Sequence, residues 1–354
     1  MQIDFHHGAT YVAARLGGLS PSDAGIVAHC AQYVDDATES GVISFADGSR
    51  YSHFSSAHKM LDYRNFQALA ASRVWLPFHF LPGNGGLPAG EDPIGPRVQK
   101  LVCRPDSPPA RDMMRACIVE QDYPWALHRL GIALHVFADT WSHQGFVGIQ
   151  HKINEAREIR DFNGKSIASV FQKITGFFVS EALPLGHGAV LSLPDRPWLR
   201  WSYLNGLGQR IERDNHALFM TAFHRIIQVV RQFVIRDPDA EVTGLTGEDA
   251  QVVAALLAME DTDKYARHAR WLESIRAGAF SFGADDIPDY IANGEGSWKH
   301  LALGVVEEEI DPSAVFVLNN RFFESDWKRF HDGLHAHSFS VGHAILPRYQ
   351  IQVP

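Results

Sequence analysis

Hydrophobic residues recur every three to four positions over most of the chain, which is the period of helices with one buried face. Ser20 as N-cap, Pro21 at the first helical position and Asp23 as the capping acid mark the start of one such helix, which should end near Gly41. The pattern predicts helices at about 10–19, 20–41, 56–72, 110–121, 124–143, 150–160, 165–182, 205–236, 246–259, 261–277 and 312–331.

Three segments depart from the helical period. Residues 42–54 alternate around a central Asp-Gly and predict a small β-hairpin, while residues 73–82 ("RVWLPFHFLP") resemble a strand. Residues 82–109 are rich in Gly and Pro and predict a long loop, and loops of this length are usually functional. The predicted fold class is therefore all-α, a multi-helix bundle with one small hairpin. The segment "DRPWLRWSYLNG" favours a boundary between a site-bearing helical domain at 1–200 and a helical region at 201–354, with one continuous domain as the alternative.

The composition is that of a globular protein, with 45% hydrophobic and 21% charged residues. The net charge of −9 and the lack of any Lys/Arg run argue against an extended nucleic-acid surface. No apolar run reaches the length of a membrane span, and the first residues lack the features of a signal peptide. We therefore expect a cytoplasmic protein, with leaderless export as the alternative. The three Cys are far apart, which fits a reducing compartment and disfavours a thiolate zinc site, and the oligomeric state stays open.

The 19 His are clustered, and the densest cluster lies on the predicted helix at 124–143. At 100° per residue, His128, His135, Asp139 and His143 fall within about 80° of arc. The rest of the helix is apolar and should be buried, so hydrogen bonds or metal ions must satisfy this polar stripe. The pair His151 and Glu155 repeats the i, i+4 spacing of His135 and Asp139. We favour metal ligation for these residues together, whereas His128 is as readily a hydrogen-bonded core residue.

Further candidates lie upstream, where each residue taken alone is more often structural than a ligand. They are His6, His7, His29, Asp35, Asp36, His53, His58 and His79. A C-terminal group contains the adjacent pair of His331 and Asp332, and its other members are His335, His337 and His343. Its spacing is irregular for one helix face, so we prefer a structural role for that group, with metal ligation or lining of the pocket as alternatives.

The order of these residues resembles the zinc-dependent phospholipase C and fungal single-strand nuclease superfamily. That superfamily has a helix with HxxxD, a His soon after it, and then HxxxE. The corresponding residues here are His135, Asp139, His143, His151 and Glu155. The superfamily also has an early His, an Asp near the end of the next helix and another His, matched in order by His7 (or His6), Asp36 (or Asp35) and His58.

The resemblance covers about residues 1–160 and is one of ligand pattern. Within it, the strings "QYVDDATESG", "SSAHKMLDYRNF" and "LHRLGIALHVFADTWSHQGF" resemble an uncharacterised bacterial domain family of about this length, which implies no known activity. The superfamily also implies an all-helical fold of the zinc phospholipase C type.

The superfamily resemblance implies two or three zinc ions per chain, with other divalent metals as alternatives. One ion would be held by Asp36, His58, His135 and Asp139; the second would be held by His143, His151 and Glu155; the third would be held by His7 with Asp139. The secreted relatives begin with a Trp that binds zinc, whereas this chain begins "MQIDF". The third ion is therefore either absent or bound through His6, Asp4 or the main chain. The weaker ligand candidates are His6, His29, Asp35 and His79.

The reaction that we expect is metal-assisted hydrolysis of a small-molecule or lipid phosphoester, with a diester favoured. Asp36 would be a ligand or the base for the attacking water, and His128 and Arg129 are candidate substrate contacts. Three alternatives remain: a metallohydrolase of another substrate such as an amide, a metal- or ligand-binding protein without catalysis, and a structural or partner protein whose His core is hydrogen-bonded and binds no metal.

Overall fold

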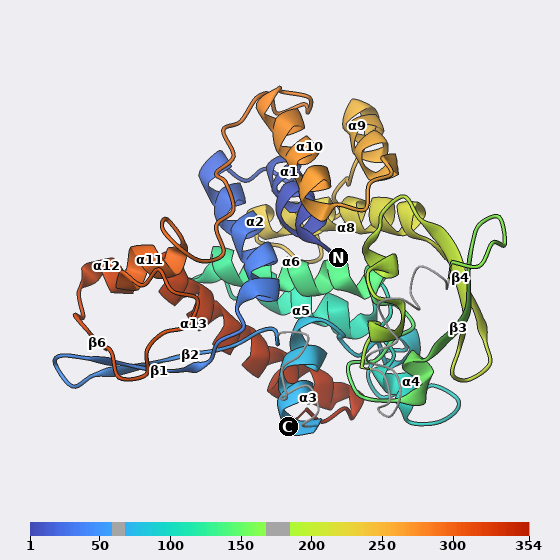
Figure 1. The fold of residues 1–354 in the computed structure, drawn as a ribbon, viewed down its shortest axis with the longest axis horizontal. Coiled ribbons are helices and arrows are strands. Elements are labelled where there is room, and N and C mark those ends of the chain that lie inside the picture. The colour runs from blue at the N-terminus through green and yellow to red at the C-terminus, as the bar shows by residue number, and fades with distance from the viewer. Residues whose placement is uncertain (59–67, 168–184, 354) are drawn as a thin grey trace.

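The computed structural model describes residues 1–58, 68–167 and 185–353, and about half of the chain is helical (Figure 1). The α-helices are α1 (Thr10–Leu16), α2 (Pro21–Asp36), α3 (Ala68–Phe78), α4 (Val98–Leu101), α5 (Pro108–Val119), α6 (Ala126–Ser142), α8 (Asn215–Ile235), α9 (Gly247–Ala258), α10 (Lys264–Arg276), α11 (Trp298–Leu303), α12 (Asn320–Phe323) and α13 (Asp326–Phe339). Two π-helical segments are Asp4–Ala9 and Ser340–Ile345, and short 3-10 turns occur at Asn84–Gly86, Lys152–Asn154, Gly188–Val190, Leu193–Asp195 and Leu346–Tyr349.

Local sequence signals fix several of these helices. The predicted start of α2 is confirmed, because the Ser20 hydroxyl accepts a hydrogen bond from the Asp23 amide at 3.1 Å. The predicted helices at 110–121, 124–143, 246–259 and 261–277 correspond to α5, α6, α9 and α10 within a few residues. The predicted helix at 165–182 lies almost wholly outside the described residues, as does much of the one at 56–72.

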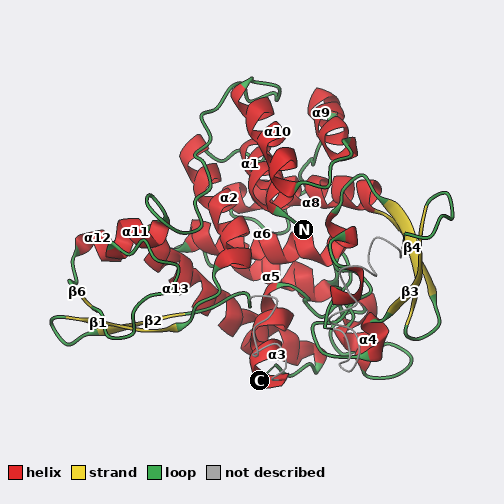
Figure 2. Cartoon of the chain, in the orientation of Figure 1, coloured by secondary structure: helices red, strands yellow, loops and turns green. Residues whose placement is uncertain are grey.

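The described strands form two three-stranded sheets at opposite ends of the helical body (Figure 2). In the first sheet, β1 (Gly41–Phe45) pairs antiparallel with β2 (Arg50–His53) and parallel with β6 (Val315–Phe316). In the second sheet, β4 (Arg200–Asn205) lies between β3 (Ala156–Asp161) and β5 (Arg210–Asp214), and both pairings are antiparallel. The predicted hairpin at 42–54 is therefore confirmed as β1 and β2.

The prediction of an all-α fold is wrong, because the chain mixes helices with these two sheets and about a tenth of it is strand. The segment near residue 200, which was expected to connect two regions of the chain, contains the central strand β4 of the second sheet. Its alternate side chains Trp201, Tyr203 and Asn205 are buried, which is the period of a half-buried strand. The predicted helix at 205–236 begins only at Asn215, after β5.

Three further element predictions are corrected. The helix expected at 150–160 is a 3-10 turn followed by β3, and the one expected at 312–331 is divided among β6, α12 and the first turns of α13. The strand expected at 73–82 begins as the end of α3. Residues 76–84 are buried without interruption, so their apolar pattern carries no period that separates strand from helix.

Helix α6 crosses the centre of the protein and organises the core (Figure 1). It packs against α2, α5, α8 and α13, and every residue from His128 to Ser142 is buried. Gly131 lets α6 approach α2 closely, because a Cβ there would lie 2.4 Å from the Val27 carbonyl oxygen and 2.5 Å from the Cys30 Cβ of α2. This contact sets the end of α2 beside the polar stripe of α6.

The large core cluster draws residues from both sides of position 200, including Phe5 and Phe137 on one side and Phe223 and Trp271 on the other. The division at residue 200 remains a prediction. Among the described helices, α8 is long and apolar enough to span a membrane by length and composition. It packs against α1, α6 and α9, and a core helix passes the same test.

Candidate metal centre

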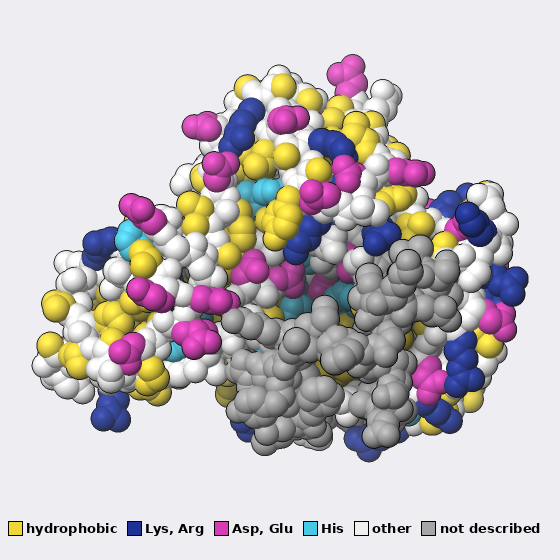
Figure 3. All heavy atoms as spheres, in the orientation of Figure 1, with side chains coloured by type: hydrophobic (Ala, Val, Ile, Leu, Met, Phe, Trp, Pro, Cys, Tyr) yellow, Lys and Arg dark blue, Asp and Glu magenta, His cyan; other side chains and the backbone are white. Residues whose placement is uncertain are grey.

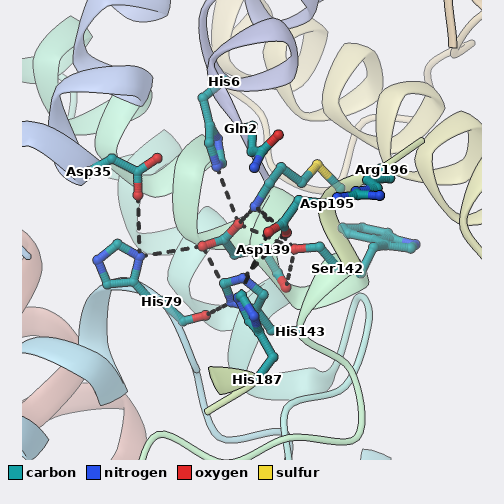
Figure 4. Close-up of polar contacts among 12 residues, drawn as sticks. Gln2, His6, Asp35, His79, Asp139, Ser142, His143, His187, Asp195 and Arg196 are labelled. Atoms are coloured by element: carbon teal, nitrogen blue, oxygen red, sulfur yellow. Dashed lines mark hydrogen bonds and ion pairs between the residues drawn. The ribbon is translucent and has the colours of Figure 1, made fainter. Parts of the chain in front are cut away.

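Asp139 on α6 is the centre of a buried cluster of His and Asp side chains (Figure 4). Its Oδ1 lies 3.3 Å from the Nε2 atom of His6, in the first π-helical segment. Its Oδ2 lies 3.3 Å from Nε2 of His135, 3.5 Å from Nδ1 of His79 and 3.5 Å from Nδ1 of His143. The two carboxylate oxygens therefore face different His side chains.

Asp195 is a second buried carboxylate in this region, at the end of the 3-10 turn Leu193–Asp195. Its Oδ1 lies 4.0 Å from Nε2 of His143, and its Oδ2 lies 4.0 Å from Nε2 of His187. The Oδ1 atom is buried and makes no hydrogen bond within the described part of the protein. The amine of Met1 lies between the two carboxylates, in contact with Asp139 and 3.5 Å from Asp195.

Four of these His side chains are oriented by hydrogen bonds to backbone carbonyls. A carbonyl oxygen only accepts, so the bonded ring nitrogen must carry the proton. The pairs are Nε2 of His79 with the Ser56 oxygen at 2.9 Å, and Nδ1 of His135, His143 and His187 with the oxygens of Ala31, His79 and Leu191 at 2.6, 2.7 and 2.7 Å. In each neutral ring the other nitrogen then presents a lone pair, which is how proteins prepare His for metals.

The cluster contains one contact that neutral imidazoles cannot satisfy. Nε2 of His135 lies 3.2 Å from Nδ1 of His79, and both atoms are the lone-pair nitrogens of their rings. Two lone pairs at this distance repel unless a proton or a metal cation lies close to both. Together with Asp139, these two His form one group whose ligand atoms lie within 4.8 Å of one another. The donors therefore fit a metal ion.

Two more groups of this kind occur among the described residues. One consists of His143, His187 and Asp195, and the other consists of His6, Asp35 and His135. The first of these shares no residue with the group around Asp139, so the protein has two separate places at which buried His and Asp groups could hold a metal ion.

The electrostatics of the cluster favour a cation. Burial disfavours the charged form of Asp139, but the positive charges of the Met1 amine and His135 outweigh it and hold the pKa of Asp139 well below its usual range. Burial lowers the pKa of His143 and of His6 well below the usual value, which keeps both rings neutral. For His135, burial is outweighed by the carboxylates of Asp139 and Asp35, so its pKa is raised.

Asp35 lies in the last turn of α2. Among the members of the three groups that lie on helices, it has the most exposed side chain. Its side chain is 33% exposed, and its Oδ1 lies 3.8 Å from both Nδ1 of His79 and Nε2 of His135. Burial in the surrounding protein raises the pKa of Asp35, and Asp139 nearby adds to this effect. Figure 3 shows a hollow at the centre of one face in which Asp or Glu and His side chains are visible. The cluster is thus polar and largely buried, and it reaches solvent at the partly exposed side chain of Asp35.

The structure brings together only part of the predicted site. The predicted residues that join the three groups are His6, Asp35, His79, His135, Asp139 and His143. The groups found among the described residues do not include His7, His29, Asp36, His58, His128, Arg129, His151 or Glu155. Where the sequence left His6 or His7 and Asp35 or Asp36 open, the structure places His6 and Asp35 in the cluster.

Asp36 points away from the cluster. Its Oδ2 accepts hydrogen bonds from Tyr290 at 2.6 Å and from Gln32 at 3.0 Å. His7 likewise faces the other side, where its Nδ1 lies 2.9 Å from Nε2 of His268. Successive residues on a helix differ by 100°, so neighbours in sequence cannot both face the same group.

His151 and Glu155 do not lie on consecutive turns of one helix, because the chain between them forms a 3-10 turn. The side chain of Asn154 holds this turn by hydrogen bonds with both backbone atoms of Val147, at 2.9 and 3.0 Å. His151 accepts from the Ile153 amide at 3.1 Å, and Glu155 forms an ion pair with Arg157 at 2.7 Å.

The remaining predicted residues have structural partners. His128 lies near the start of α6, 2.9 Å from Asp326, and Arg129 pairs with Glu120. His29 stacks on Trp298 with ring centroids 3.8 Å apart, and His58 is buried beside Trp75. Several C-terminal His contact the backbone: His331 accepts from the Phe54 amide, and His335 and His337 donate to the carbonyls of Ser52 and Pro77.

Sequence reasoning missed His187 and Asp195 as site residues. Both lie in irregular segments that follow no helical or strand period, so only the tertiary fold brings them to α6. A signal was nonetheless present in part, because a His and an Asp in otherwise apolar surroundings are candidates for buried, paired groups.

A profile for a family of unknown function, DUF6765, matches residues 1–345. The chain belongs to this family. No curated protein and no solved structure matches it. The DUF6765 match spans every residue of the three groups described above, so the whole centre lies within the family region.

Proposed function

We propose that the protein is a metal-dependent hydrolase that binds zinc at this centre and cleaves a phosphoester, with a diester favoured. The observation that carries the proposal is the convergence of lone-pair nitrogens from His79, His135, His143 and His187 on the buried carboxylates of Asp139 and Asp195. Imidazole and carboxylate ligands together suit Zn²⁺.

Two separate ligand groups support a centre with two ions. His79, His135 and Asp139 would hold one ion, and His143, His187 and Asp195 would hold the other. Metal ions bound at these groups would lower the pKa of a bound water and neutralise charge on phosphoryl oxygens. The order of His135, Asp139 and His143 along the chain, which resembles the zinc phospholipase C superfamily, also supports a phosphoester substrate.

Among the residues of the centre, Asp35 is best suited to accept a proton from the attacking water. Its side chain is partly exposed, whereas that of Asp139 is 1% exposed. Burial raises the pKa of Asp35, and a carboxylate with a raised pKa is a better base near neutral pH. Asp36 does not suit this role, because Tyr290 and Gln32 already hold its carboxylate.

A metal-binding protein without catalysis is the second candidate. The burial of both ligand groups favours it, since most of these side chains have little contact with solvent. The partial exposure of Asp35 is the feature that supports catalysis over this alternative.

Activity assays distinguish the two candidates. We expect zinc-loaded protein to hydrolyse bis(p-nitrophenyl) phosphate or phosphatidylcholine, to lose activity with a chelator and to recover it with zinc. Asp139→Asn should be inactive, and Asp36→Asn is the matched control that should remain active. Metal-loaded protein that hydrolyses only members of an amide panel would contradict the phosphoester substrate, and one that hydrolyses nothing would contradict the hydrolase.

A further inference from the structure

Arg196 lies at the end of the cluster away from His79, beside Asp195 (Figure 4). It directly follows the 3-10 turn that carries Asp195, and Asn215 fixes its backbone by donating to the Arg196 carbonyl at 2.8 Å. The same turn that supplies a ligand candidate therefore also places a guanidinium at the edge of the centre.

The charge of Arg196 has little compensation within the described part of the protein. Its guanidinium donates one hydrogen bond, to the Ser192 hydroxyl at 3.3 Å, and it forms no ion pair with a described carboxylate. A half-buried guanidinium with spare donors is available to bind an anion.

The neighbouring Arg267 shows the contrast. Its guanidinium contacts both oxygens of Asp4, at 2.6 and 3.2 Å, and the side-chain oxygen of Gln2 at 2.6 Å. Its hydrogen-bonding capacity is largely used inside the protein, whereas that of Arg196 is not. Gln2 lies beside the cluster as well, on the same side as Arg196 (Figure 4).

We propose that Arg196 is the substrate-binding residue for a phosphoryl oxyanion, which it would hold next to the ligand group of His143, His187 and Asp195. The inference rests on the proposed hydrolase function and specifies its substrate class. A planar guanidinium donates two parallel hydrogen bonds to a phosphoryl group, which Lys cannot do. The residue thereby selects an anionic substrate over a neutral amide.

The test is calorimetric titration of inorganic phosphate into zinc-loaded protein that contains no excess zinc. We expect Arg196→Met to weaken phosphate binding by about tenfold to a hundredfold, the loss typical of a hydrogen bond to a charged group. Arg196→Lys should weaken it less. The matched control is Arg231→Met, since Arg231 is a half-buried arginine on α8 whose partners Thr243 and Leu16 lie outside the centre. It should bind phosphate as the wild type does.

Zinc content and the KM for a phosphodiester complete the test. All three variants should retain the zinc of the wild type, and Arg196→Met should raise KM. The inference would be overturned by wild-type protein that binds no phosphate, by Arg196→Met that binds it normally, or by loss of zinc from that variant. If phosphate binding depends on Arg196 but no phosphoester is cleaved, Arg196 is a phosphate-binding residue and the hydrolase proposal fails. If cleavage occurs with an unchanged KM in Arg196→Met, the reverse holds.

Discussion

Replacing Asp139 with Asn should remove most of the metal affinity without changing the shape of the centre. The substitution keeps the volume and removes one charge from a carboxylate whose oxygens lie within 3.5 Å of nitrogens from four His side chains. The carboxylate is 1% exposed, so water cannot replace it. Removing one partner of a buried charged pair costs about 3–5 kcal/mol. This corresponds to metal binding that is weaker by roughly a hundredfold to a few thousandfold.

Thermal unfolding with and without zinc measures this loss. At a free zinc concentration of about 100 times the wild-type Kd, bound metal should stabilise the wild type by about 2.7 kcal/mol. A hundredfold weaker site at the same concentration would contribute only about 0.4 kcal/mol. The zinc-dependent increase in Tm should therefore be large for the wild type and nearly absent for Asp139→Asn.

Asp36→Asn is the control, because Asp36 is an acid that lies one residue from Asp35 and binds Tyr290 outside the cluster. It should keep the full zinc-dependent stabilisation. If Asp36→Asn abolished that stabilisation and Asp139→Asn preserved it, the assignment of Asp139, and not Asp36, to the metal centre would be refuted.

Five further predictions follow from the geometry. Asp35→Asn should lower kcat by about 10²- to 10⁴-fold while most of the metal is retained, which steady-state kinetics and metal analysis can measure. An unchanged kcat would show that Asp35 is not the base. The pKa of His135 is raised above 6.5, so protons should compete with zinc increasingly as the pH falls through that raised value. The Kd for zinc should therefore rise when the pH is lowered from 8 to 5. A Kd independent of pH would count against His135 as a ligand. In the metal-free protein the same shift stabilises the fold below pH 6.5, and this contribution should disappear as the pH rises through the folded pKa, which urea unfolding at several pH values can detect. Gly131→Ala should lower the free energy of unfolding by about 1–3 kcal/mol and weaken zinc binding, since its Cβ would collide with the Val27 carbonyl 2.4 Å away; zinc affinity equal to that of the wild type would show that α2 does not position the site. His151→Ala should leave the zinc content unchanged. Loss of an ion from this variant would show that His151 is a metal ligand, as the sequence predicted.

The sequence predicted the core of the centre because periodicity determines which residues share a helix face. His135 and Asp139 are one turn apart, and in a helix that is apolar elsewhere they had to face a common interior group. The structure places both in one ligand group with His79. Periodicity also predicted the long helices α5, α6, α9 and α10, whose patterns are local.

The choice between neighbouring residues could not be made from the sequence. Asp35 and Asp36 both lie in the last turn of α2, and which one faces α6 depends on how the two helices pack. The close contact of Gly131 with Val27 and Cys30 fixes that rotation in the structure. A single sequence does not reveal that these particular residues touch.

Two of the three members of the second ligand group could not be predicted, for a different reason. His187 and Asp195 lie in irregular segments, between elements whose order along the chain does not specify their positions in space. The helix expected at 150–160 failed because the spacing of His151 and Glu155 suggested two consecutive turns. Side-chain hydrogen bonds from Asn154 instead favour a tight turn that leads into β3.

Metal content of protein purified without an affinity tag tests the central claim most directly. Elemental analysis should find about two zinc ions per chain, one for each separate ligand group. Asp139→Asn should reduce this content, and Asp36→Asn should not. A content below about 0.2 divalent ions per chain, unchanged after incubation with zinc and removal of the excess, would contradict the account.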